Sequence, residues 1–164
     1  MKQNLVKLIE NSIRENWQLP ALSNFEKDTL SYAELGQKIM WLHRCLQKMN
    51  VMPGEKIAVL GRNSVNWAVT YLSAVLYGAV IVPVLPDFHA DDIHHIINHS
   101  EAKLLFVANE IYDRLDDGKM NRLEAILSLE NFAPLFCKQK NIHKIWAEPF
   151  PEIQKEEFSV PTGS

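Results

Sequence analysis

The chain has 164 residues, of which 47% are hydrophobic and 23% are charged, and its formal net charge is -3. This length is enough for one domain with its own core, and the hydrophobic content excludes an intrinsically disordered chain. The slightly acidic balance argues against a nucleic acid as the partner, because domains that bind phosphate backbones are usually basic.

The cysteine pattern and the hydropathy predict a reduced, cytoplasmic chain without a transmembrane segment. Cys45 and Cys137 lie far apart and form neither a CxxC motif nor a disulfide framework. The longest nearly uncharged stretch, 65–86, contains polar residues and two prolines, which favours a buried helix followed by a strand. The first ten residues lack the continuous apolar core of a signal peptide.

The first third of the chain predicts two helices separated by a short β-hairpin. A first helix ends before Pro20, and two short strands are expected at 21–25 and 29–31. Ser31 precedes Glu34 by three residues, the spacing of a capping box, so a second helix is expected to begin there. The apolar stripe of this second helix comprises Leu35, Ile39, Leu42, Leu46 and Met49.

Three continuous apolar runs in the middle of the chain alternate with helical patterns. The runs are 57–61, 79–82 and 103–107, and the second is closed by Pro83. The helices between them begin after Ser64 and at Ala90 or Asp91, and Gly78 ends the first of the two. This alternation predicts an α/β fold of three layers, in which helices cover both faces of a mainly parallel sheet.

The pattern weakens after residue 107. Residues 111–129 are predicted to be helical, with an optional break at Asp116-Asp117-Gly118. Residues 142–146 are interpreted as one more strand. Residues 149–164 contain three prolines and no periodicity, which is typical of a linker. We therefore expect an α/β subdomain over residues 1–148 and a linker or tail over residues 149–164.

The sequence contains none of the motifs that bind phosphate or generate a nucleophile. It has neither a GxxxxGK[ST] loop nor a GxSxG elbow. The turn from Gly61 to Ser64 places a helix start after a strand, but with one glycine a helix cap is favoured over an anion site. Arg62, at the end of a strand, could face a ligand, although a surface role is favoured. We therefore assign no catalytic, cofactor-binding or metal-binding residue.

A histidine-rich segment and four tryptophans offer two further candidate sites. On a helix, His95 and His99 share a face and could bind a metal, but tetrahedral sites need three or four ligands. The favoured interpretation of 89–99 is a solvated helix face, and metal binding by it is left open. The tryptophans are interpreted as core or interface residues, and Cys45 as a buried hydrophobic residue. Besides His95 and His99, the histidines of this segment are His89 and His94, and the four tryptophans are Trp17, Trp41, Trp67 and Trp146.

Five segments, in order and with matching spacing, resemble motifs of the adenylate-forming superfamily, which includes acyl-CoA synthetases, adenylation domains of peptide synthetases and luciferases. Glu55 replaces the aspartate that is usual in the second of them. All five resemble scaffold segments of the superfamily. The segments are Leu30–Leu35, Val51–Val59, Asn63 with Trp67, Ala74–Val84 and His99–Val107.

The resemblance is strongest to bacterial long-chain fatty acid–CoA ligases, and it implies a two-step ligation. A fatty acid carboxylate attacks the α-phosphate of ATP to give an acyl-adenylate and pyrophosphate, and coenzyme A then displaces AMP. ATP, Mg²⁺ and coenzyme A would serve the whole enzyme, whose reactive segments follow the region matched here. We therefore expect an N-terminal fragment that binds none of these cofactors and is inactive without the remaining domains of the same chain.

Two other hypotheses stay open from the sequence. One is a self-sufficient α/β module that binds a nucleotide or acyl ligand at the strand ends near 61–64. The other is a dimerisation or docking domain with exposed apolar surface, which leaves a homodimer possible. The length of the acyl chain, the oligomeric state and the origin of the chain's end at residue 164 do not follow from the sequence.

Overall fold

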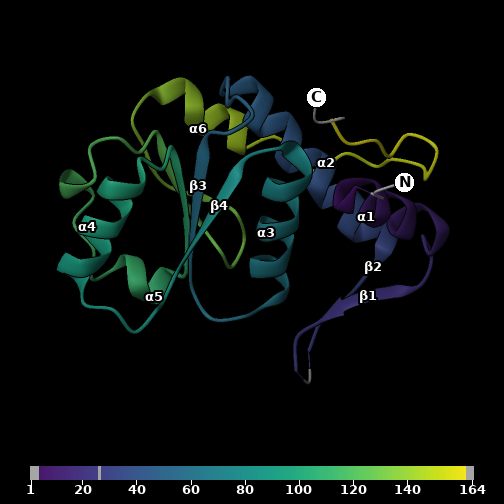
Figure 1. Ribbon diagram of the computed structural model, residues 1–164, viewed down its shortest axis with the longest axis horizontal. Helices are drawn as coiled ribbons and strands as arrows, with labels where there is room; N and C mark the ends of the chain where they lie inside the picture. The colour runs from purple at the N-terminus through teal and green to yellow at the C-terminus, as the bar shows by residue number, and fades with distance from the viewer. Residues whose placement is uncertain (1–3, 26, 162–164) are drawn as a thin grey trace.

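The computed structural model describes residues 4–25 and 27–161. A central sheet carries helices on both faces, and a two-stranded hairpin projects from one side of the molecule (Figure 1). The elements of the described residues are, in chain order, α1 (Leu5–Glu15), β1 (Pro20–Ser23), β2 (Thr29–Ser31), α2 (Tyr32–Lys48), β3 (Lys56–Leu60), α3 (Val65–Tyr77), β4 (Val80–Val84), α4 (Ala90–Ser100), β5 (Leu104–Val107), α5 (Asn109–Tyr112), a 3₁₀ turn η1 (Asp117–Lys119), β6 (Ala125–Ser128), β7 (Pro134–Cys137) and α6 (Lys140–Trp146).

The central sheet has the strand order β4-β3-β5-β6-β7. The four strands β4, β3, β5 and β6 run parallel, and β7 pairs antiparallel with β6. The separate hairpin pairs β1 with β2. The predicted three-layer α/β fold with a mainly parallel sheet and an N-terminal hairpin is therefore confirmed.

Two apolar cores lie on opposite faces of this sheet. Alternate residues of β3 belong to different cores, with Ile57 and Val59 in the first and Ala58 and Leu60 in the second. The first core packs under α1, α2, α3 and α6, and the second under α4 and α5. Burial on both faces explains why the central strands read as continuous apolar runs in the sequence.

The predicted helix boundaries are held by the expected caps. Ser31 Oγ accepts a hydrogen bond from Glu34 N–H, and Ser64 Oγ accepts one from Trp67 N–H, both at 3.1 Å. Gly78 ends α3 in the left-handed region with φ of 90°, which a residue without a Cβ adopts at little cost.

Strand β4 differs from its prediction as a strand buried on both faces and closed by Pro83. It lies at the edge of the sheet, so part of its surface is exposed, and it runs through Pro83 to Val84. An edge strand tolerates proline because one side of the strand has no ladder partner for the missing N–H.

Two predictions after residue 107 were wrong. The helix expected over 111–129 is replaced by α5, η1 and the buried strand β6, and the strand expected at 142–146 is part of helix α6. Ala125–Ser128 is a short apolar run, which periodicity alone cannot assign to a helix or a strand. In α6, Ile142 and Trp146 are four residues apart and are buried on one helix face.

The segment predicted as a linker packs against the body of the molecule. Phe158 and Val160 are buried in the first core, and the Phe158 ring lies 6.2 Å from that of Trp17. Arg14 Nε donates a hydrogen bond to the carbonyl oxygen of Phe158 at 2.9 Å. The division of the chain at residue 148 stays a prediction, but residues up to 160 contribute to the fold.

Among the helices of residues 4–25 and 27–161, none has the length and apolar character required to cross a membrane.

Candidate functional site

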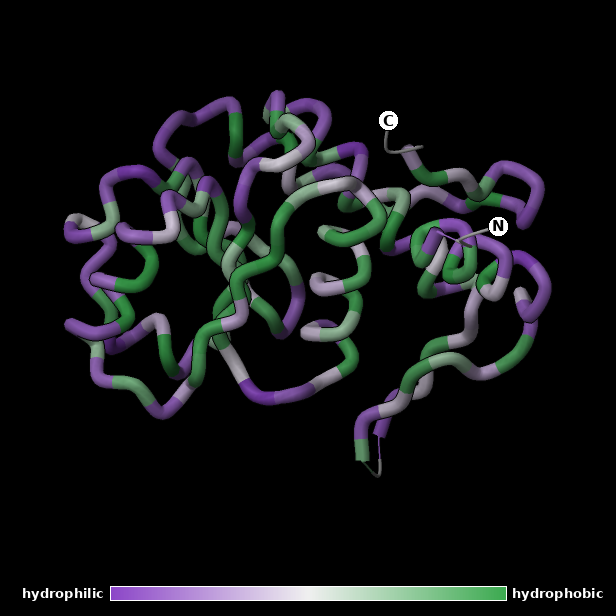
Figure 2. Tube along the Cα trace, viewed as in Figure 1, coloured by the Kyte–Doolittle hydropathy of each residue, from purple (hydrophilic) through white to green (hydrophobic). Residues whose placement is uncertain are grey.

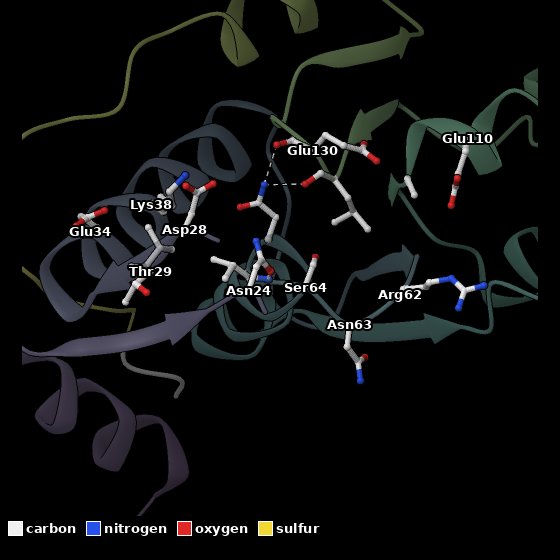
Figure 3. Close-up of a pocket in the computed structure, with 15 residues that line it drawn as sticks. Asn24, Asp28, Thr29, Glu34, Lys38, Arg62, Asn63, Ser64, Glu110 and Glu130 are labelled. Carbon is white, nitrogen blue, oxygen red and sulfur yellow. Dashed lines mark hydrogen bonds between the residues drawn. The ribbon is translucent and has the colours of Figure 1, made fainter. Parts of the chain in front are cut away.

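A cleft of about 730 Å³ opens at the carboxyl ends of the parallel strands (Figure 3). Loops that follow β3, β5 and β6 form one side, and the hairpin with the start of α2 forms the other. From β3 the chain passes through α3 to β4, which lies on one side of β3 in the sheet. The chain later forms β5, which lies on the other side of β3. Ligands in open α/β sheets bind at this kind of switch point, so the cleft is the candidate site.

Two asparagines hold the walls of the cleft to the beginning of α3. Asn24 Oδ1, from the hairpin, accepts a hydrogen bond from Val65 N–H at 2.9 Å. The side-chain amide of Asn66 donates to the carbonyl oxygens of Leu129 and Glu130 at 2.7 and 3.0 Å, as the dashed lines in Figure 3 mark. The hairpin and the turn after β6 are therefore positioned by the same helical end.

The carboxylate of Glu130 fixes the loops after β5 and β6 relative to each other. Its oxygens accept hydrogen bonds from Asn109 N–H at 3.1 and 3.3 Å and from Ser128 Oγ at 2.9 Å. These bonds bring the ends of two neighbouring parallel strands together at the floor of the cleft.

The N-terminus of α3 is satisfied by the chain's own side chains. Val65 N–H is bonded to Asn24, and Trp67 N–H is bonded to Ser64. Free N–H groups at a helix N-terminus attract a phosphate, and these two N–H groups of α3 are already bonded within the chain. The capping interpretation of the 61–64 turn is confirmed.

The charged side chains that line the cleft are mostly negative. Four carboxylates line it against two cations, Lys38 and Arg62. Burial lowers the pKa of Lys38, and its Nζ lies 4.7 Å from the centroid of the Phe150 ring, in a cation–π contact. Arg62 is exposed, and its Nη2 lies 4.0 Å from Asp87 Oδ1. The carboxylates belong to Asp28, Glu34, Glu110 and Glu130.

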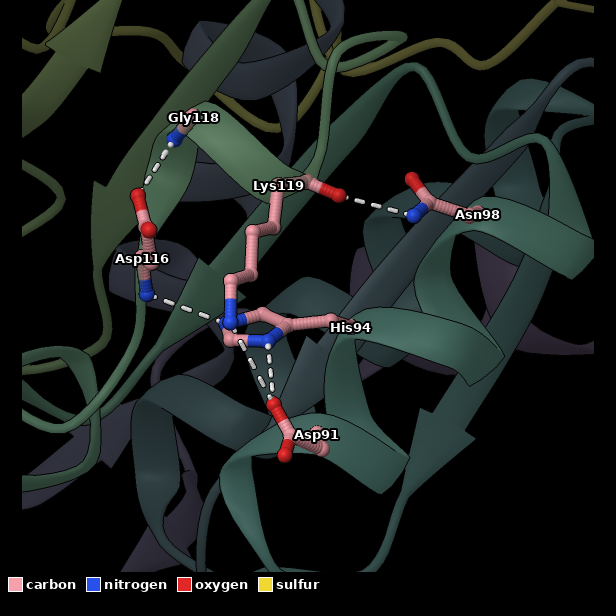
Figure 4. Close-up of polar contacts among 6 residues, drawn as sticks. All are labelled: Asp91, His94, Asn98, Asp116, Gly118 and Lys119. Atoms are coloured by element: carbon pink, nitrogen blue, oxygen red, sulfur yellow. Dashed lines mark hydrogen bonds and ion pairs between the residues drawn. The ribbon is translucent and has the colours of Figure 1, made fainter.

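The histidine-rich segment is only partly the solvated face that the sequence predicts. His94 is buried, and its Nε2 accepts a hydrogen bond from Asp116 N–H at 3.0 Å (Figure 4). Its Nδ1 lies 3.7 Å from Asp91 Oδ1, and Lys119 Nζ lies 3.5 Å from the same oxygen. The interpretation of His94 as solvated was wrong, because this side chain joins α4 to the turn that contains η1.

The other histidines of the segment 89–99 lie at or near the surface of α4. His95 and His99 are exposed, with rings that stack at a centroid separation of 6.1 Å. His89 precedes the helix and makes no side-chain cap. Within the part of the chain that the structure describes, no three histidine, cysteine or carboxylate side chains converge to hold a metal.

Cys45 and three of the four tryptophans lie in the core, as predicted. Trp17, Trp41 and Trp146 are buried, and Trp67 is half-buried and stacks on Tyr71 at 5.5 Å. Burial raises the pKa of the Cys45 thiol to about 12, so the thiolate needed for nucleophilic attack is not formed near neutral pH.

One wall of the cleft is indicated by the sequence pattern, whereas its remaining polar residues have no such signal. The strand-end rule pointed to the turn with Arg62, Asn63 and Ser64, which lines the cleft. Asn24 and Glu130 were missed because one lies in a hairpin turn and the other follows a strand that the sequence did not predict. Their shared contact with the start of α3 is a tertiary feature without a local sequence signal.

Residues 9–158 match the family described as "AMP-binding enzyme". Three curated relatives illustrate the similarity. Surfactin synthase subunit 2 of Bacillus subtilis is 29% identical over 60% of this chain and 3% of its own length. Long chain acyl-CoA synthetase 4 of Arabidopsis thaliana is 26% identical over 67% of this chain and 16% of its own. A fatty acid–[acyl-carrier-protein] ligase of Streptomyces coeruleorubidus is 28% identical over 66% of this chain and 21% of its own.

Solved structures share the fold. A long-chain-fatty-acid-CoA ligase from Archaeoglobus fulgidus superposes with a TM-score of 0.68 and 19% identity over 94% of this chain and 32% of its own. A mutant coronafacic acid ligase from Pectobacterium brasiliense gives a TM-score of 0.75 and 18% identity over 90% and 30%. The chain thus spans about a third of these solved chains, and less than a quarter of the three curated relatives.

Proposed function

Because the chain belongs to the AMP-binding enzyme family, we propose that it is the N-terminal scaffold of an ATP-dependent acyl-CoA synthetase that activates long-chain fatty acids. The family match over residues 9–158 carries this proposal. The similarity to a long chain acyl-CoA synthetase and the fold shared with a long-chain-fatty-acid-CoA ligase support the substrate class. In the complete reaction, fatty acid, ATP and coenzyme A give acyl-CoA, AMP and pyrophosphate.

We further propose that the 164-residue chain alone does not adenylate fatty acids. Transfer at a phosphate requires cations and N–H donors directed at the developing negative charge. The cleft instead has four carboxylates against two cations, and the N–H groups of Val65 and Trp67 in α3 are already bonded. The role of these residues is therefore to support parts of the enzyme that bind ATP, Mg²⁺ and coenzyme A.

The test is an assay of AMP and pyrophosphate formation by the purified chain with palmitate, ATP, Mg²⁺ and coenzyme A. We expect no product above a control without protein. A protein made from the longest reading frame that contains this sequence should form palmitoyl-CoA in the same assay. Turnover by the 164-residue chain would contradict its role as a scaffold, and a longer protein that activates no carboxylic acid would contradict the ligase assignment.

A second candidate acceptor is the thiol of a carrier protein in place of coenzyme A. Similarity to a peptide synthetase subunit and to a fatty acid–[acyl-carrier-protein] ligase favours it. The same longer protein, offered palmitate and ATP with either coenzyme A or a phosphopantetheinylated carrier protein, separates the two candidates. Acyl transfer to coenzyme A at least as fast as to the carrier protein supports our proposal, and transfer to the carrier protein alone supports this alternative.

A further inference from the structure

His94 is a polar side chain that α4 buries beside its apolar face. Ile93 and Ile97 of this helix belong to the second core, and Figure 2 shows hydrophilic and hydrophobic residues alternating along α4. His94 is only 6% exposed, whereas the next residue, His95, lies on the surface. The ring of His94 contacts residues 113–120, which follow α5 and contain η1. We call these residues the η1 segment.

The contact between His94 and the η1 segment fixes where the ring carries its hydrogen. Asp116 N–H donates a hydrogen bond to His94 Nε2 at 3.0 Å (Figure 4). A backbone N–H can only donate, so Nε2 has no hydrogen and the neutral ring carries it on Nδ1. Nδ1 has no hydrogen-bond partner among the described residues and lies 3.7 Å from Asp91 Oδ1. The ring thus holds the η1 segment through one acceptor, which exists only while the imidazole is neutral.

Protonation of His94 acts against this contact in two ways. It adds a hydrogen to Nε2, so two N–H groups face each other across the 3.0 Å between the ring and Asp116, and the hydrogen bond is lost. It also places a positive charge beside Lys119, whose Nζ lies 3.5 Å from Asp91 Oδ1, the oxygen nearest to Nδ1. Asp91 is 89% exposed, so water weakens its attraction for both cations. Both effects act on the η1 segment.

The other ionisable groups nearby are bonded elsewhere or exposed. Asp116 Oδ1 accepts a hydrogen bond from Gly118 N–H at 3.0 Å, and Asp117 Oδ2 accepts one from Tyr112 OH at 2.9 Å. Burial raises the pKa of Tyr112 to about 12, so this group stays neutral near neutral pH. Strand β4, which packs against α4, has no charged residue. The exposed groups on α4, α5 and the η1 segment are Asp92, His95, His99, Glu110, Asp113 and Arg114.

We propose that His94 is a pH-sensitive switch, which binds the η1 segment to α4 when the imidazole is neutral and releases it when the imidazole is protonated. Histidine is the side chain whose charge ordinarily changes between about pH 5 and about pH 8. At the other end of the segment, Asn98 Nδ2 donates to the carbonyl oxygen of Lys119 at 2.7 Å, and this bond does not titrate. The release is therefore a local opening around Asp116.

Hydrogen exchange of the 164-residue chain, followed by NMR at about pH 7.5 and about pH 5.5, tests the proposal. The protection factor of the Asp116 amide is corrected for the intrinsic effect of pH on exchange. We expect it to fall at the lower pH by at least about tenfold more than the protection factors of the β5 amides, which report on global unfolding. An equal fall in both regions, or no fall at Asp116, would overturn the proposal.

Two variants separate His94 from the other titratable groups. His94→Gln keeps a side-chain acceptor for Asp116 N–H but does not titrate, so the additional fall at Asp116 should disappear. His95→Gln is the matched control, because His95 is the adjacent histidine of the same helix and is exposed. This control should keep the response of the parent chain. A response that persists in His94→Gln, or that disappears in His95→Gln, would contradict the role given to His94.

The ring nitrogens of His94 provide a measurement that needs no variant. Their ¹⁵N chemical shifts in the parent chain should identify the form protonated at Nδ1 at about pH 7.5, and should change with the same midpoint as the Asp116 amide signal. A ring protonated at Nε2 at that pH, or two separate midpoints, would overturn the proposal.

Discussion

His43 is a neutral side chain held between α2 and α3. It is buried, and its Nε2 lies 2.8 Å from the carbonyl oxygen of Ser73. Because a carbonyl oxygen only accepts, Nε2 carries the proton, while Nδ1 lacks a partner within the described chain. Burial lowers the pKa of His43 from 6.5 to about 4, against a smaller opposing effect of the bond to Ser73.

This lowered pKa predicts a loss of stability in acid. Between about pH 6.5 and about pH 4, the unfolded chain binds a proton at His43 that the folded chain does not, so the free energy of unfolding falls as the pH falls. The pKa difference sets the loss at about 3 kcal/mol or less. Urea unfolding at about pH 7 and about pH 4.5 measures it.

The comparison uses His43→Gln, which keeps an N–H donor for Ser73 but does not titrate. This variant should lose less stability between the two pH values than the parent chain, because the remaining titratable groups are common to both proteins. Equal losses would contradict the role given to His43.

At the scale of elements, the segment 149–161 behaves as part of the fold. Gly36 in α2 makes room for it, since a Cβ there would lie 2.9 Å from the Trp17 ring and 3.3 Å from the Phe158 ring. Glu148, just before the segment, accepts a hydrogen bond from Trp41 Nε1 through its carbonyl oxygen at 2.8 Å. The segment therefore connects α1 and α2 through side-chain packing that no local pattern in its own sequence indicates.

Phe158→Ala tests this packing. Phe158 is 0% exposed, and we expect its truncation to lower the free energy of unfolding by about 3 kcal/mol, since a buried Phe→Ala change removes apolar contacts and leaves a cavity. Phe25→Ala is the matched control, because the same side chain is 90% exposed there and its loss should have almost no effect. Equal small effects of both changes in urea unfolding would mean that the segment is a linker after all.

The elements that the sequence predicted have strong local signals, whereas the missed ones depend on tertiary packing. Ser31 and Ser64 identified two helix starts, because a cap is a contact between residues three apart. The short run Ala125–Ser128 is a strand that pairs with both β5 and β7, and its own sequence does not indicate either partner. The same holds for the residues of the candidate cleft. The 61–64 turn was predicted from a local signal, whereas Glu130, whose position depends on tertiary contacts, was not.

At the scale of the whole molecule, the hairpin side and the sheet share one core. The first core contains Ile13 and Trp17 from the N-terminal helical region, Leu30 from the hairpin, Phe106 from the central sheet and Phe158 from the last segment. Buried side chains that contact one another across elements unfold together, because separating them exposes apolar surface on both sides. The projecting hairpin in Figure 1 is therefore expected to be part of a single cooperative unit.

Ile13→Ala tests whether this coupling extends from α1 to the sheet. Ile13 is buried, and its truncation should cost about 2–5 kcal/mol. If the molecule is one unit, hydrogen-exchange mass spectrometry in moderate urea should show equal losses of protection in α1 and in β5, although β5 is distant in sequence. Leu5→Ala, on the exposed face of the same helix, should change neither. Loss of protection confined to α1, with β5 unaffected, would mean that the N-terminal helix unfolds independently of the sheet.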